Sequence, residues 1–162
     1  MRSPLPTFLA ACLLTGFAKA QVDDIGLYLH GGFLTVLYGQ ECGPVGCTPF
    51  AGGPIAAGET RTLTHYSAPG SIFAIAVGLP GPCTPLPGID NPLLLGSIVF
   101  LDAGITSAPP FVALPCQQGI GQGSLMIPAN TPAGLVIRMQ SIGISPSTGG
   151  LALGPTIEAT IV

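Results

Sequence analysis

Residues that could carry out acid–base or nucleophilic chemistry are scarce in this sequence. The histidines are His30 and His65. A serine–histidine–aspartate arrangement would require one of them beside a serine and Asp102, because the imidazole accepts the serine proton and the carboxylate orients the ring. The serines open to such an arrangement are Ser67, Ser71 and Ser124. The G-x-S-x-G turn that exposes a nucleophilic serine does not occur. We therefore predict no catalytic residue, with a small hydrolase built on either histidine as an alternative.

The acidic side chains do not form an evident site either. Glycoside hydrolysis needs two carboxylates in one cleft, and the adjacent pair Asp23 and Asp24 lies near the N-terminus, where a solvated tail is expected. Calcium takes about six to eight oxygen ligands, and no stretch spaces its acidic residues as a calcium loop does. The glycine patterns of phosphate and dinucleotide sites are absent. The sequence thus predicts no cofactor and no metal ligand, although loop carbonyls could hold an ion beside Asp23, Asp24 or Asp102.

The first twenty residues have the order of a secretory signal peptide. Arg2 gives a positive start, Leu5–Phe17 is an apolar run too short to span a bilayer, and Ala18-Lys19-Ala20 supplies the small residues of a cleavage site. We predict cleavage after Ala20, which leaves a secreted, extracellular chain with one domain over residues 21–162. Leu9-Ala10-Ala11-Cys12 fits a lipoprotein cleavage site, so lipid anchoring through Cys12 is the alternative.

The cysteines that follow the signal peptide are Cys42, Cys47, Cys83 and Cys116. An even number in an exported chain predicts two disulfides, for which three connectivities are possible. We expect Cys42 to pair with Cys47 across a short loop, and Cys83 to join Cys116. A zinc site using the C-x4-C spacing of the first two cysteines is the alternative.

Charge limits the partners of the mature chain. Removing Arg2 and Lys19 leaves two basic residues against seven acidic ones, a net charge of −5. Without a basic patch the protein is a poor partner for nucleic acid or an anionic membrane surface. Charged residues make up 7% of the sequence, against about a quarter in typical soluble domains. No transmembrane segment is expected in the mature chain, and its apolar composition excludes disorder.

Glycine and proline determine the fold class. The chain holds 24 glycines and 18 prolines, and almost no window of twelve residues lacks both, so helices are nearly excluded. Apolar runs separated by turn residues predict short strands. We expect an all-β sandwich of about seven to nine mostly antiparallel strands, of jelly-roll or immunoglobulin-like kind. The expected strands are Ile25–His30, Phe33–Gly39, Glu59–Tyr66, Ile72–Leu79, Leu93–Asp102, Ser124–Pro128, Leu135–Ile144 and Thr156–Val162.

Alternation within these strands predicts which faces are buried. The strand Ile72–Leu79 is apolar on both faces, so it should be central or covered by a second surface. In Glu59–Tyr66, three alternating threonines should form the solvent side and His65 should point to the opposite face. The tyrosines lie in or beside apolar strands, where packing is expected for Tyr28, Tyr38 and Tyr66.

The C-terminal two thirds carry a further pattern. Ala68-Pro69-Gly70-Ser71 enters an apolar strand that ends in Val77-Gly78-Leu79, and Leu86-Pro87-Gly88 precedes Leu93-Leu94-Leu95. Leu125–Pro128 and Gly134–Gln140 then lead to a closing apolar strand. Over about residues 60–162 this outline resembles a group of uncharacterised, secreted, Gly/Pro-rich bacterial proteins of unassigned function. The resemblance implies a turn-rich β domain and brings no catalytic residues with it.

Three classes of function are compatible with these features. The leading prediction is a secreted structural or interaction module of the cell surface or matrix, not an enzyme, because a folded chain with so few charges must cover its apolar area. Its partner would be a second copy of itself, another surface protein or a polysaccharide. The alternative is an extracellular module that binds carbohydrate or another ligand through loops at one end of the sandwich. The third class is the small hydrolase described above.

Overall fold

The computed structural model describes residues 22–31, 36–108 and 119–162. None of them is helical, and twelve strands form three sheets. The predictions that fall on residues 1–21, namely the whole signal peptide with Cys12 and the cleavage site, lie outside the described residues, as does Cys116. No helix that could cross a membrane occurs among the residues described. The predicted all-β sandwich is confirmed, with more strands than expected.

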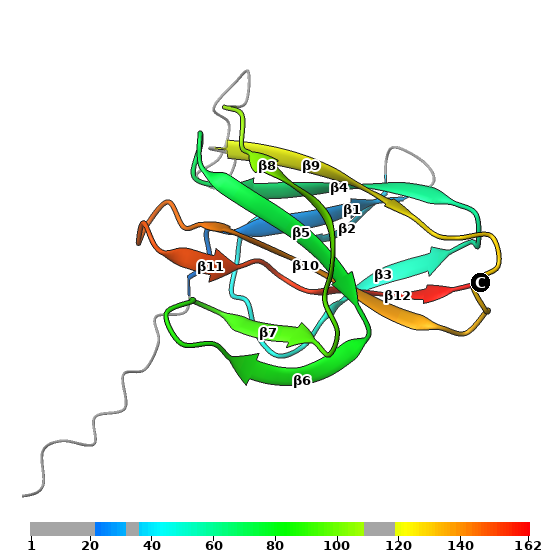
Figure 1. Ribbon diagram of the computed structural model, residues 1–162. Coiled ribbons are helices and arrows are strands. Elements are labelled where there is room, and N and C mark those ends of the chain that lie inside the picture. Colours follow the sequence, from blue (N-terminus) through cyan, green and yellow to red (C-terminus); the bar gives the residue numbers. More distant parts are fainter. Residues whose placement is uncertain (1–21, 32–35, 109–118) are drawn as a thin grey trace, which may run out of the picture.

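Two sheets face one another, as Figure 1 shows. The four-stranded sheet has the antiparallel order β2-β1-β4-β9, and its strands are β1 (Gly26–His30), β2 (Leu37–Gln40), β4 (Thr60–Ser67) and β9 (Gly119–Met126). The six-stranded sheet has the order β3-β12-β10-β5-β8, with β11 paired to β10. Its strands are β3 (Phe50–Ile55), β5 (Ile72–Gly78), β8 (Val99–Ile105), β10 (Val136–Ile144), β11 (Leu151–Leu153) and β12 (Ile157–Ile161). Only the β12–β3 pair of these named strands is parallel.

The core lies between the two sheets. The inner faces of both sheets contribute side chains that are fully or almost fully buried. Their burial removes apolar area from water. From the four-stranded sheet these are Leu27, Leu29, Leu63 and Leu125, and from the six-stranded sheet they include Ile75, Met139, Ile157 and Ile161. Tyr38 packs against the same cluster. Each of these side chains lies in a segment that the sequence predicted to be a strand.

A hairpin covers the outer face of the six-stranded sheet. Its strands are β6 (Pro80–Pro85) and β7 (Pro92–Leu95), drawn below β10 and β5 in Figure 1. Two side chains of β10 hold it: the Arg138 guanidinium donates to the Gly81 and Leu94 carbonyls at 2.8 and 3.1 Å, and the Gln140 amide bonds both Pro92 and Leu94. The sequence predicted that β5, apolar on both faces, would be central or covered by a second surface. It lies between β10 and β8, and Ala76 on its outer face shares a pocket with Leu93 and Leu95 of the hairpin.

Several strand predictions need correction because glycine and proline were taken as loop signals. The run Leu93–Asp102 is two strands, β7 and β8, broken where Gly96 turns back to donate to the Leu79 carbonyl. Strands β3 and β6 contain proline and were expected as loops. Both lie where proline is tolerated, at a sheet edge and in a two-stranded hairpin. Strand β9 begins five residues before the expected start at Ser124.

The disulfide pairing also differs from the prediction. Cys47 is bonded to Cys83, with 5.4 Å between their Cα atoms, so the expected pairs Cys42–Cys47 and Cys83–Cys116 are wrong. The bond ties the segment before β3 to the covering hairpin, a juxtaposition that sequence spacing does not encode. Closing 36 residues stabilises the fold by about 4 kcal/mol in the loop-entropy picture. Cys42 is disulfide-bonded as well.

Candidate functional site

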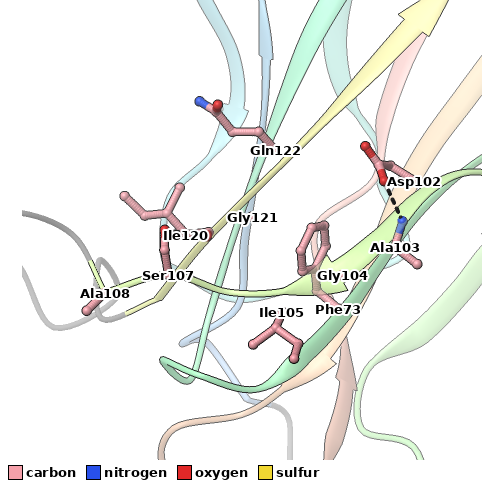
Figure 2. Close-up of a pocket in the computed structure, with 10 residues that line it drawn as sticks. All are labelled: Phe73, Asp102, Ala103, Gly104, Ile105, Ser107, Ala108, Ile120, Gly121 and Gln122. Atoms are coloured by element: carbon pink, nitrogen blue, oxygen red, sulfur yellow. Dashed lines mark hydrogen bonds between the residues drawn. The ribbon is translucent and has the colours of Figure 1, made fainter.

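The two sheets part at one side of the sandwich and leave a groove. Strand β8 is the free edge of the six-stranded sheet and β9 is the free edge of the four-stranded sheet. Between them lies an open space of about 520 Å³ (Figure 2). One end is closed where Ser107 and Ile120 exchange two backbone hydrogen bonds of 2.9 and 2.8 Å. The groove therefore runs along the seam of the sandwich and is open to solvent.

Glycines keep this groove open. The first three inward positions of β9 are Gly119, Gly121 and Gly123, ahead of Leu125, so this part of the strand presents bare backbone to the interior. A Cβ at Gly121 would lie 2.5 Å from the Phe73 ring, and a Cβ at Gly104 of β8 would lie 3.2 Å from it. Figure 2 shows the ring between these two glycines. The Phe73 ring is 7% exposed and packs against the backbone of these glycines, so it forms a mostly buried floor beneath the groove.

Polar groups stand at the rim. Asp102 pairs in register with Ile75 and so points toward the opposite sheet, yet its side chain is exposed because Gly123 faces it. Asp102 Oδ1 accepts a hydrogen bond from the Ala103 amide at 2.8 Å, and Oδ2 has no partner among the described residues. The exposed Gln122 amide lies on the β9 side. Ile105 adds an apolar side chain that is 71% exposed.

His65 lies beneath the groove and packs against Phe73. It is fully buried, and the two rings stack with centroids 5.4 Å apart. Its Nδ1 shares a hydrogen bond of 2.8 Å with the Ser141 hydroxyl, and its Nε2, which lies near Gly143, has no hydrogen-bond partner among the described residues. Burial lowers the pKa of His65 to about 3, so the ring is neutral. A substrate cannot reach this pair, which acts as a packing unit.

The structure does not assemble the serine–histidine–aspartate arrangement. His30 lies on the outer face of the four-stranded sheet, where its Nε2 bonds the Thr64 hydroxyl at 2.8 Å, whereas His65 lies on the inner face. Of the candidate serines, Ser67 is buried, Ser71 bonds the Ala68 carbonyl, and Ser124 is exposed on the outer face. Asp102 alone of these candidates belongs to the groove.

Two further predictions from the sequence, for Asp24 and Thr64, need correction. Asp24 is not a solvated tail: its carboxylate accepts bonds from the Ser145 hydroxyl and, at 2.6 Å, from the Ser147 amide, which fixes the turn between β10 and β11. Thr64 is 4% exposed, under His30, rather than on the solvent side with the exposed Thr60 and Thr62.

Among the described residues no three histidine, cysteine, aspartate or glutamate side chains are grouped so that they could hold a metal ion.

The sequence did carry a signal for the groove. Strand β9 has glycine at 119, 121 and 123, and glycines on one strand face leave a bare backbone that another group can approach. Together with Gly104, this pattern makes room for the Phe73 ring beneath the groove. Our reading of the sequence took only Ser124–Pro128 as a strand, so the alternation of glycines was missed.

The chain was compared with known proteins by sequence and by structure. No protein-family model matches the sequence, and no curated protein matches it. A cellulose-active lytic polysaccharide monooxygenase in complex with copper matches with TM-score 0.41 and 12% identity, over 66% of this chain and 51% of its own. A chitin-binding domain from Burkholderia pseudomallei gives 0.38 and 12%, over 67% and 56%. An AA10 lytic polysaccharide monooxygenase from Streptomyces lividans gives 0.37 and 13%, over 66% and 57%. The chain spans a little more than half the length of these proteins.

The leading predictions from the sequence, a structural or self-associating module and a chain that is not an enzyme, do not agree with these neighbours, of which two are enzymes and one is a chitin-binding domain. The β6–β7 hairpin covers part of the apolar area, on the outer face of β5, where Ala76 is 7% exposed. Other large apolar side chains stay exposed, such as Phe100 at 67% and Val99 at 60%. The likeness concerns part of a fold, so the functional argument that follows uses this chain's own residues.

Copper, which the first of these neighbours holds, can be tested against the residues present here. Imidazole nitrogen suits copper, but His30 and His65 lie on opposite faces of one sheet and cannot share an ion. His65 Nδ1 is occupied by Ser141. The described residues therefore do not fit a copper site, and no chemistry is derived through one.

Proposed function

We propose that this chain is an extracellular carbohydrate-binding module that holds a polysaccharide chain in the β8–β9 groove. The observation that carries the proposal is the open space of about 520 Å³ between β8 and β9, which has exposed side chains, those of Asp102, Gln122 and Ile105, at its rim. Ligand sites are typically concave and apolar with a few converging polar groups. This groove combines those features and is open to solvent along one side.

The chemistry of a sugar fits the lining. A sugar ring has apolar C–H faces and hydroxyl edges, so it can contact an apolar side chain while its hydroxyls donate to a carboxylate and exchange hydrogen bonds with an amide. Ile105, which is 71% exposed, supplies the apolar contact, Asp102 the carboxylate and Gln122 the amide. The proposed ligand therefore lies along the seam with its hydroxyls toward Asp102 and Gln122.

Charge favours a polysaccharide without acidic groups. Both arginines of the described residues are already paired, Arg61 with Glu59 at 2.9 Å and Arg138 with Glu158 at 2.8 Å. Asp102 would repel a uronate or a sulfate at the groove. The disulfide Cys47–Cys83 suits an oxidising compartment, which supports the extracellular part of the proposal together with the signal peptide expected from the sequence.

A binding assay with matched glycine variants tests the proposal. Cellulose and chitin, the polysaccharides named for the structural neighbours, are the first probes, in pull-down and calorimetric titration. Gly104→Ala should weaken binding, because its Cβ would sit 3.2 Å from the Phe73 ring and cover the floor. Gly46→Ala is the control, since a Cβ there meets nothing within 4 Å. Equal binding by Gly104→Ala and Gly46→Ala, or no binding of either polysaccharide by the native chain, would refute the proposal.

A further inference from the structure

The register of the four-stranded sheet connects the groove to two aromatic rings on the outer face. Ile120 and Gln122, which line the groove, point outward from β9. Ile120 lies opposite Tyr66 of β4, and Gln122 lies opposite Thr64. Thr64 in turn lies opposite Tyr28 of β1. Side chains directly opposite one another on one face of a sheet are in contact, so a continuous strip leads from the groove rim to Tyr28.

The two tyrosines form a preorganised unit on this strip. Their rings meet edge to face with centroids 5.9 Å apart and planes at 90°. Both are partly exposed on the outer face of the sheet, whereas Tyr38, also partly exposed, packs against the core. Burial raises the pKa of each, and the nearby charge of Glu41 raises it further, so both hydroxyls stay protonated and available as donors. Rings held in this way can stack on a ligand with little loss of side-chain freedom.

From this continuity we infer that the Tyr66–Tyr28 strip is a second subsite, which binds the continuation of the same polysaccharide chain after it leaves the groove over Gln122. The inference rests on the proposed function. Neighbouring strands are about 4.8 Å apart, so β9 to β1 spans about 10 Å. The strip therefore lengthens the binding surface by that distance without a second pocket. The partly exposed rings offer apolar contacts to the faces of sugars, and Thr64 lies buried between them. The chain thus recognises long oligosaccharides better than short ones.

Calorimetric titration with cello- and chito-oligosaccharides of two to six units tests this inference. For the native chain, affinity should rise with length beyond the shortest ligand that fills the groove. Tyr66→Thr and Tyr28→Thr should each lower the affinity for the longest ligand by roughly three- to tenfold, the loss of one aromatic contact, and leave the shortest ligand unaffected. Met126→Thr is the control, because Met126 is 70% exposed on the same face but lies about 20 Å along β9 from Ile120.

A measurement on the native chain keeps the inference testable if a tyrosine variant fails to fold. The ring proton signals of Tyr28 and Tyr66 should shift on adding a hexasaccharide but not a disaccharide, while those of Tyr38 stay fixed. Binding with no dependence on length, or equal losses for short and long ligands in the tyrosine variants, would overturn this inference alone. Absence of binding at every length would overturn the proposed function as well.

Discussion

The burial of His65 should lower the free energy of unfolding in acid. Burial lowers the pKa of His65 from 6.5 to about 3, so the folded protein keeps the ring neutral while the unfolded chain protonates it below pH 6.5. Protons then favour unfolding, and the stability lost between pH 6.5 and pH 3 is set by the difference in pKa. One pKa unit corresponds to about 1.4 kcal/mol. The expected loss is therefore about 2 kcal/mol at pH 5 and about 3 kcal/mol at pH 4.

Urea unfolding at pH 7, 6, 5 and 4 measures this loss. The reference is the double variant His65→Phe/Ser141→Ala, which removes the titrating ring together with the hydroxyl that bonds it. All other ionisable groups are the same in both chains, so the difference between the two pH slopes reports His65. The native chain should lose about 2 kcal/mol more than the double variant between pH 7 and pH 5.

A core variant distinguishes the loss of stability caused by protonation of His65 from a loss that is the same at every pH. Ile75→Val should cost about 1 kcal/mol at every pH, because Ile75 is buried in the same layer and carries no charge. It should therefore keep the native pH slope. Parallel pH profiles for the native chain and the double variant would refute the reasoning, as would a His65 ring signal that titrates near pH 6 in the folded protein.

Three further outcomes follow from the described contacts. Arg138→Ala should lower the free energy of unfolding by roughly 2–3 kcal/mol, because its bonds to the Gly81 and Leu94 carbonyls hold the hairpin, and chemical denaturation checks this. Replacing Cys47 and Cys83 by serine should cost about 4 kcal/mol, and a change below 1 kcal/mol would argue against the loop-entropy estimate. Polyanions such as sulfated or uronate polysaccharides should not bind at low salt, and retention on such a resin would contradict the charge argument.

The fold could be predicted from the sequence wherever a strand alternates cleanly. In β12, Ile157, Ala159 and Ile161 share the buried face, and in β10 the buried Ile137 and Met139 alternate with Arg138. These periods are local, and burial enforces them. The apolar β5 also indicated a covering layer, since neither of its faces could be left to water.

The arrangement of the site could not be predicted in the same way. Strand β6 contains three prolines, at 80, 82 and 85, so local propensity favours a loop, and only its docking on Arg138 makes it part of a hairpin. The Cys47–Cys83 bond depends on that docking. The groove depends on β8 and β9 being the free edges of different sheets, which is a property of strand order. Asp102 was singled out from the sequence, but as a possible triad member or ion ligand rather than as the rim of a groove.

The central claim is that the β8–β9 groove binds a polysaccharide chain, and a backbone amide NMR titration with a neutral oligosaccharide tests it most directly. The account predicts saturable shifts at Gly104, Gly121 and Gln122, which line the groove. The amide of Gly149, in the turn between β10 and β11, should remain fixed. Absence of shifts at millimolar oligosaccharide, or shifts confined to the β10–β11 turn, would contradict the account.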